Sequence, residues 1–176
     1  MANTYVAIQT VTVGSGGSAT IAFTSIPATY TDLHLLLSLR TSGTGSSYGS
    51  IGQITFNSTS SGYTVQDIYG FGSGGAGTAG FSFATTYIPT GRDDNANQTA
   101  NTFSNQSVYI PNYTSSDNKS ASVDAVNENN NTTYMTTALL AAKSTVTSAI
   151  NAITITSGDG NYVQYSSATL YGIKNS

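Results

Sequence analysis

The sequence predicts an all-β fold: one domain over residues 1–176, built as a jelly-roll-like antiparallel β-sandwich of about 9–11 short strands. Apolar and polar residues alternate with period two from end to end, whereas a helical period is nearly absent. Clusters of Gly, Ser, Asn and Asp interrupt this alternation at intervals of roughly 8–15 residues, which is typical of sandwiches and barrels. Each of the three prolines follows an isoleucine, and because proline cannot donate a ladder hydrogen bond, we expect strand ends or corners at Pro27, Pro89 and Pro111.

Two hairpins are expected in the first half of the chain. Thr4–Val13 and Ser18–Ser25 both alternate, and the turn Gly14–Gly17 between them is rich in glycine, which reaches positive φ without steric cost. Ile51–Phe56 and Gly62–Tyr69 form a second such pair across a short polar segment. Two alternating runs joined by a short turn predict paired neighbouring strands.

A leucine-rich strand is expected at Thr31–Arg40, between the two hairpins. Its odd-numbered leucines would share one buried face, while His34 and Leu36 point the other way. Leucine also favours helices, so a helix is the alternative. We favour a strand because Pro27 precedes the segment and Gly43 follows it.

The second half of the chain predicts further strands separated by polar loops. Gly70–Gly80 and Arg92–Asn101 are expected to be loops, and a helical turn is possible around Ser148–Ile150. The expected strands are Phe81–Ile88, Phe103–Ile110, Ser120–Val126, Tyr134–Lys143, Ile153–Ile155, Tyr162–Gln164 and Ala168–Ile173.

Charge is scarce in this chain. Charged residues make up 7% of it, against about 25% in an ordinary soluble domain, while 38% is apolar and includes 12 Tyr and 6 Phe. Such a composition predicts a folded chain, since disordered chains combine low hydrophobicity with high net charge. The net charge is −3. The five cations are scattered along the chain: Arg40, Arg92, Lys119, Lys143 and Lys174. We therefore expect neither nucleic acid nor an anionic membrane as a partner.

Cellular location and redox chemistry are constrained by what the sequence lacks. There is no cysteine, so disulfides and thiolate metal sites cannot form. We find no signal-peptide pattern at the N-terminus and no apolar run of the roughly 20 residues that span a bilayer. We therefore expect synthesis in a host cytoplasm and no membrane insertion.

A search for catalytic groups predicts that the protein is not an enzyme and has no catalytic, cofactor-binding or metal site. His34 is the single histidine, and we interpret it as a packed side chain rather than the base of a nucleophile. Asp124 and Glu128 share a face if their strand continues, but we interpret them as solubilising charges rather than glycosidase carboxylates. A calcium site at Asp93–Asn95 is the other alternative, although its spacing fits no calcium loop. Gly70–Gly75 lacks the lysine of a phosphate-binding loop.

Tyrosines are the most informative residues for binding. They offer rigid, amphipathic surface that loses little entropy on contact. Together with Asn, Ser and Gly loops, they fit either contacts between subunits or the binding of sugars. Ten lie within or beside predicted strands: Tyr48, Tyr63, Tyr69, Tyr87, Tyr109, Tyr113, Tyr134, Tyr162, Tyr165 and Tyr171.

Five segments resemble a family of small structural proteins from tailed phages, cyanophages in particular. They are Met1–Tyr5, Ser25–Leu33, Thr99–Phe103, Tyr109–Ser115 and Leu170–Ser176. The similarity extends over essentially the whole chain and implies a virion setting, but it brings no catalytic or ligand-binding residues with it.

The resemblance and the composition together lead to two functional hypotheses. In the first, the protein is a capsid decoration or cement protein, a homo-oligomer with a trimer favoured, that docks on the major capsid protein and stabilises the head. In the second, it is a tail-fibre or baseplate domain that recognises polysaccharide of the host surface.

Overall fold

A computed structural model describes residues 4–72, 78–127, 130 and 134–174. In this part of the chain all regular structure is β, as predicted, and twelve strands are present. They are β1 (Tyr5–Thr12), β2 (Thr20–Phe23), β3 (Asp32–Ser38), β4 (Gln53–Phe56), β5 (Tyr63–Phe71), β6 (Thr78–Thr85), β7 (Ile88–Pro89), β8 (Asn105–Ile110), β9 (Lys119–Asn127), β10 (Thr136–Ser144), β11 (Ile153–Thr156) and β12 (Ser167–Ile173).

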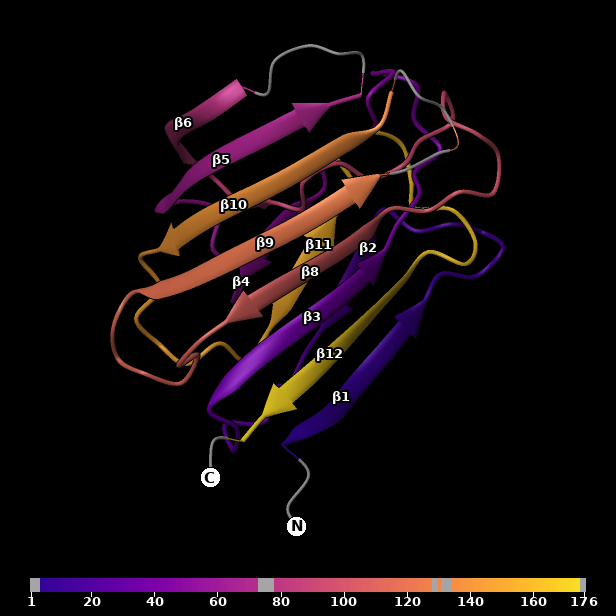
Figure 1. Ribbon diagram of the computed structural model, residues 1–176. Helices are drawn as coiled ribbons and strands as arrows, with labels where there is room; N and C mark the ends of the chain where they lie inside the picture. Colours follow the sequence, from indigo (N-terminus) through magenta and orange to yellow (C-terminus); the bar gives the residue numbers. More distant parts are fainter. Residues whose placement is uncertain (1–3, 73–77, 128–129, 131–133, 175–176) are drawn as a thin grey trace.

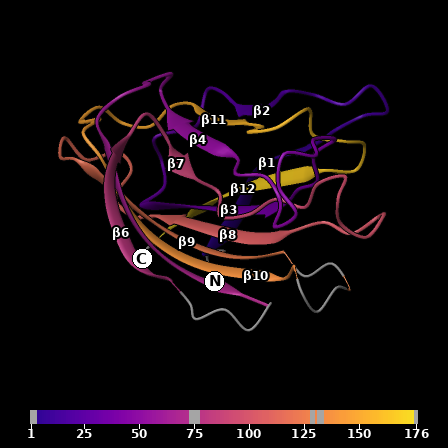
Figure 2. The same cartoon turned by 90° about the horizontal axis from the view of Figure 1, so that it is seen from above.

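The strands form two antiparallel sheets that pack as a sandwich. The larger sheet has eight strands in the order β1-β12-β3-β8-β9-β10-β5-β6, and the smaller has four in the order β2-β11-β4-β7. Figure 1 looks onto the larger sheet with the smaller one behind it, and Figure 2 shows the two layers edge-on. The predicted β-sandwich is therefore confirmed.

The strand order identifies the topology as a jelly roll with two inserted strand pairs. Strands at opposite ends of the chain pair in turn: β1 with β12, β2 with β11, β3 with β8, and β4 with β7. Successive pairs alternate between the two sheets. These eight strands therefore form two layers of four strands each, which is the jelly-roll plan. The pairs β5–β6 and β9–β10 interrupt this plan and extend the larger sheet beyond β8.

Both predicted hairpins of the first half are wrong. β1 and β2 lie in different sheets, and so do β4 and β5. A glycine-rich turn between two alternating segments permits either a hairpin or a crossing to the opposite sheet, and the choice depends on partners far along the chain. The region Gly70–Ile88 also differs from the prediction: β5 extends to Phe71, β6 begins at Thr78, and β7 is separate.

The helical turn expected around Ser148–Ile150 is absent, and an asparagine explains the extended path. Asn57 Nδ2 donates to the carbonyl oxygen of Ala149 (2.9 Å). Its Oδ1 accepts the backbone N–H groups of Asn151 (3.0 Å) and Ala152 (3.1 Å). These backbone groups are thus satisfied by a side chain from the β4–β5 connection and need no helical partner.

The core lies between the sheets, and each strand contributes alternate residues to it. In β3 this confirms the strand over the helix, because Leu33, Leu35 and Leu37 are buried whereas Leu36 is exposed. Several inward positions on β9 and β10 are alanine. Small side chains are needed there because the backbone at Gly91 passes close to Ala125 and Ala138. Gly91, at φ +97°, passes so near that a Cβ on it would lie 2.5 Å from the Cβ of Ala125.

Lys119 is a fully buried cation that holds the β8–β9 connection in place. Its Nζ donates to the carbonyl oxygens of Ser115 (2.8 Å), Asp117 (2.6 Å) and Val146 (3.3 Å). Burial lowers the pKa of this lysine. Three acceptors from two separate connections therefore converge on one side chain, which gives Lys119 a structural role.

We expect Lys119→Met to lower the free energy of unfolding by about 2–4 kcal/mol, because a fully buried side chain loses three hydrogen bonds to backbone carbonyl oxygens. Lys174→Met is the matched control. Its ammonium lies in solvent 5.8 Å from the ring centroid of Tyr30, so its loss should cost less than about 1 kcal/mol. Urea denaturation followed by circular dichroism measures both variants, and equal losses would show that the carbonyl cluster does not depend on the lysine.

Candidate functional site

The outward-pointing side chains of the larger sheet form the most apolar exposed surface of the described chain, which we call the outer face. Exposed large hydrophobic residues number seven among the described residues, and five of them lie on this face. They are Tyr5 on β1, Leu36 on β3, Tyr109 on β8, Leu139 on β10 and Ile68 on β5. Because a monomer normally scatters such residues, their concentration on one face marks a candidate interaction site.

One half of the outer face is aromatic. His34 faces Tyr171 across the β3–β12 ladder and Tyr109 across the β3–β8 ladder. The ring of Tyr5 meets His34 edge-on, with centroids 5.8 Å apart, and meets Tyr171 at 6.2 Å. Four neighbouring strands thus present a continuous row of rings, an arrangement that gives rigid contact area.

His34 is a packed residue, in keeping with its interpretation from sequence. Its Nε2 lies 2.7 Å from Ser107 Oγ, and burial lowers its pKa, so the ring is neutral at pH 7. Tyr109 OH donates to Asp32 Oδ2 at 2.7 Å, and this bond is the main cause that raises the pKa of Tyr109 to about 12. The aromatic half therefore exposes little charge, because its carboxylate, Asp32, is only 3% exposed and accepts from Tyr109.

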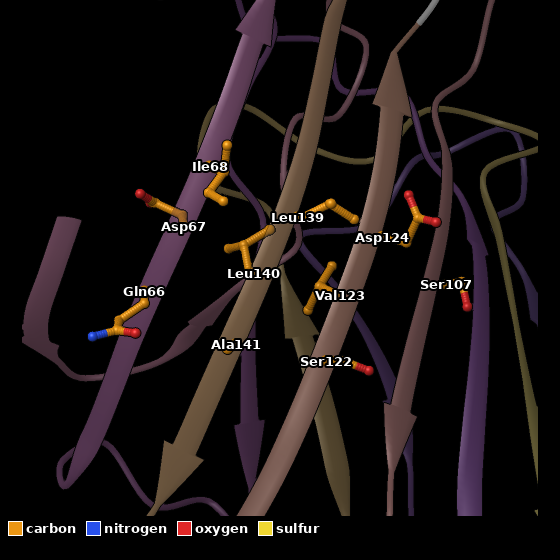
Figure 3. Close-up of a pocket in the computed structure, with 10 residues that line it drawn as sticks. All are labelled: Gln66, Asp67, Ile68, Ser107, Ser122, Val123, Asp124, Leu139, Leu140 and Ala141. Atoms are coloured by element: carbon orange, nitrogen blue, oxygen red, sulfur yellow. The ribbon is translucent and has the colours of Figure 1, made fainter. Parts of the chain in front are cut away.

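The other half of the outer face is aliphatic and contains a hollow of about 490 Å³ over β8, β9, β10 and β5. Small side chains contribute to it, because Ala141 on β10 lies opposite Ser122 on β9, and Ser107 on β8 lies opposite Asp124 on β9. Figure 3 shows Ile68 and Leu139 beside this hollow. Both are 58% exposed. Two protruding aliphatic side chains therefore stand next to a cavity able to receive similar groups.

Formal charge is nearly missing from the outer face. Among its described residues the exposed charged ones are Asp124 on β9 and Lys143 on β10, which have opposite signs, whereas Asp32 on β3 is only 3% exposed. Asp124 lines the hollow and lies opposite Leu139. Glu128 lies outside the described residues, so the prediction that Asp124 and Glu128 are solubilising charges rather than a carboxylate pair stays a prediction.

The outward surface of the smaller sheet has a different character. Its strands present small or hydroxyl-bearing side chains, and none of the exposed large hydrophobic residues of the described chain lies on it. The outward positions include Thr20, Ala22, Thr55, Thr154 and Thr156. The sandwich thus has one apolar face and one polar face.

Asp93 lies within the polar part of the core and not in an exposed loop. Its side chain is completely buried. Its Oδ1 accepts hydrogen bonds from Gln106 Nε2 (2.7 Å) and Thr90 Oγ1 (2.9 Å). The hydroxyl group of Tyr162 lies 3.5 Å from its Oδ2. Burial raises the pKa of Asp93 to about 6, although the bonds from Gln106 and Thr90 oppose the shift. Donors already surround this carboxylate, so the alternative of a calcium site at Asp93–Asn95 gains no support. The described residues contain no group of three or more His, Cys, Asp or Glu side chains that could hold a metal ion.

Arg40 connects this polar part of the core to the β7–β8 connection. Its Nη1 donates to the carbonyl oxygens of Thr99 (2.8 Å) and Thr102 (3.0 Å), and its Nη2 donates to that of Gln98 (3.2 Å). This cation serves the fold and is not available to a ligand.

A polar cleft of about 430 Å³ lies among the loops at one end of the sandwich. Its lining includes Tyr87, Gln53, Arg92 and Asp159. Arg92 Nη1 donates to the carbonyl oxygen of Gly49 (3.2 Å). Gln53 and Asp159 add further polar side chains to the lining of the cleft. An aromatic ring beside hydrogen-bonding side chains is a combination that can bind a sugar.

Comparisons with known proteins bring no further identification. No family model, curated protein or solved structure matches the chain. No helix in the described ranges is long and apolar enough to cross a membrane.

Sequence reasoning predicted a strand at Tyr134–Lys143 but did not identify either face of it as an interaction site. The signal was present in the same segment. Thr136–Ser144 carries Leu139 and Ala141 on one side and Leu140 and Ala142 on the other, so both faces of the strand are apolar. A strand with two apolar faces indicates cover on both sides.

Proposed function

We propose that the protein is a structural component of a phage virion, a capsid decoration or cement protein that docks on the major capsid protein and stabilises the head. The observation that carries this proposal is the outer face, a broad and nearly uncharged surface on a rigid sandwich. The resemblance of five segments to structural proteins of tailed phages supports the virion setting. In this proposal the protein acts as a homo-oligomer on the capsid surface and performs no catalysis.

Adhesion by many copies explains how such a protein stabilises a head. Each copy needs only a modest interface, because the contacts of neighbouring copies act together and the effective concentration on a lattice is high. A nearly neutral surface also avoids mutual repulsion when copies crowd together. The small number of charges in the chain favours this role over one that depends on long-range attraction.

The test is to compare virions with and without the protein. We expect particles that lack it to lose DNA at lower temperature and after milder osmotic shock, with restored durability when the purified protein is added back. Quantitative mass spectrometry should find hundreds of copies per virion. Unchanged durability, with the protein present only at the tail in electron micrographs, would contradict the decoration role.

The polar cleft favours a second candidate function, recognition of host polysaccharide by a tail-fibre or baseplate domain. Tyr87 and its hydrogen-bonding neighbours offer stacking and polar contacts to a sugar ring. If this is the function, Tyr87→Ala abolishes binding on a glycan array or to host cells, and a virion holds tens of copies or fewer. Depolymerisation of host polysaccharide by the purified protein would instead point to a hydrolase.

A further inference from the structure

We infer that copies of this chain associate through the outer face of the larger sheet, with the aliphatic hollow of one copy covered by another copy. This inference deepens the proposed function, because it assigns the contact that would build the homo-oligomer. Its support comes from the size, charge and shape of the outer face.

The area of the outer face matches what a stable protein interface requires. Seven described strands contribute to it, from β1 through β5 in sheet order. With strands ~4.8 Å apart and ~3.3 Å of rise per residue, seven strands of about seven residues cover roughly 34 by 23 Å, close to 800 Å². A standard interface buries about 800 Å² on each partner, so one copy of this face can supply a complete half.

The charges of the outer face favour a second copy over a charged partner. The exposed charges of Asp124 and Lys143 are opposite in sign and Asp32 is buried, so this face carries a net charge of only −1 although the whole chain carries −3. A strongly basic or acidic partner would meet no strong electrostatic potential of opposite sign on this surface. A face with so little net charge opposes the approach of a second copy only weakly.

The shape of the outer face is also self-complementary. Ile68 and Leu139 protrude next to a hollow of about 490 Å³ floored by Ala141, Ser122 and Ser107. When two such faces meet, the protruding aliphatic side chains of one can enter the hollow of the other and remove apolar surface from water. The polar outward surface of the smaller sheet offers no equivalent contact.

The first experiment measures the mass of the full-length protein by light scattering and analytical ultracentrifugation. The monomer is 18.1 kDa, and we expect twice this mass at micromolar concentration, because a face that meets a second copy of itself closes as a two-fold dimer. Leu139→Asp places a charge beside Asp124 on the contact and should weaken association by at least about 100-fold. Ala22→Asp, on the polar face, is the matched control and should leave the mass unchanged. Because both side chains are exposed, both variants should fold, as circular dichroism can verify.

The second experiment uses the absence of cysteine from the chain. Leu139→Cys then introduces a single thiol, and a short bismaleimide linker should join two copies in high yield. Ala22→Cys should remain uncrosslinked under the same conditions. A monomer at ~100 µM, an oligomer that persists in Leu139→Asp, or crosslinking at residue 22 alone would overturn the inference. None of these results bears on where the protein sits in a virion, so the inference and the proposed function fail separately.

Discussion

Leu35→Ala is expected to lower the free energy of unfolding by about 3–4 kcal/mol, and the neighbouring change Leu36→Ala by less than about 1 kcal/mol. Leu35 is fully buried at the centre of the larger sheet, where it lies between Leu170 of β12 and Val108 of β8. Truncation removes three buried carbons and leaves a cavity that two tightly hydrogen-bonded neighbouring strands cannot close. Leu36 is 40% exposed on the outer face, so its truncation leaves no cavity.

The contrast between these adjacent leucines tests the alternation on which the fold prediction rests. Urea denaturation of both variants should be carried out at low protein concentration, where association through the outer face contributes little. A strand requires opposite behaviour at consecutive positions, whereas the alternative helix would place Leu35 and Leu36 about 100° apart on one flank. Comparable losses at the two positions would contradict the alternation of β3.

Asp93→Asn is expected to remove a pH dependence of stability worth about 3 kcal/mol. The pKa of Asp93 is about 6 in the folded protein, against 3.8 for an unperturbed aspartate. Folding therefore favours the protonated carboxyl. Its stabilising effect is complete below pH 4, declines as the pH rises through about 6 and is lost above that value. A shift of about 2 pKa units corresponds to about 3 kcal/mol.

Asparagine fits the site because its carbonyl oxygen can accept from Gln106 and Thr90, and its NH₂ group can donate to the hydroxyl oxygen of Tyr162. Unfolding free energies of the wild type and the variant, measured from pH 4 to pH 7, give the result directly. The wild type should lose stability over this interval relative to Asp93→Asn. Asp124→Asn, which removes an exposed carboxylate instead, should show the same decline as the wild type. Parallel curves for the wild type and Asp93→Asn would show that Asp93 is ionised at no cost in the folded state.

Local patterning was enough to locate most strands, because inward and outward residues alternate within a few positions. The leucines of β3 are an example, and their buried positions follow the predicted parity. Pairing depends on distant segments, so it did not follow from local signals. Nothing near Gly14–Gly17 records that β1 pairs with β12, which joins residues as far apart as Tyr5 and Ile173.

The polar segments show a second limit of sequence reasoning. Arg92–Asn101 resembles a solvent-exposed loop, yet Asp93, Asp94 and Asn95 are completely buried. The burial of Asp93 is tolerated because polar groups surround its carboxylate, Thr90 from the same connection and Gln106 from β8. A sequence window contains only some of these partners, so composition alone could not separate a buried polar segment from an exposed one.

Prediction of the outer face requires both the local alternation of side chains and the order of the strands in the sheet. Successive side chains of a strand point to opposite sides of the sheet. Leu139 and Ile68 therefore point away from the core, because their neighbours along each strand point into it. The exposed hydrophobic residues of the outer face share a single surface because of the strand order, since long-range pairing places β1 and β5 in one sheet and β2 and β4 in the other. These residues are Tyr5, Leu36, Tyr109, Leu139 and Ile68. The sequence thus established an all-β chain of alternating strands with very little charge. The long-range pairing established which of its apolar residues gather on one uncovered face, because hydrogen bonds between distant strands set the order of a sheet.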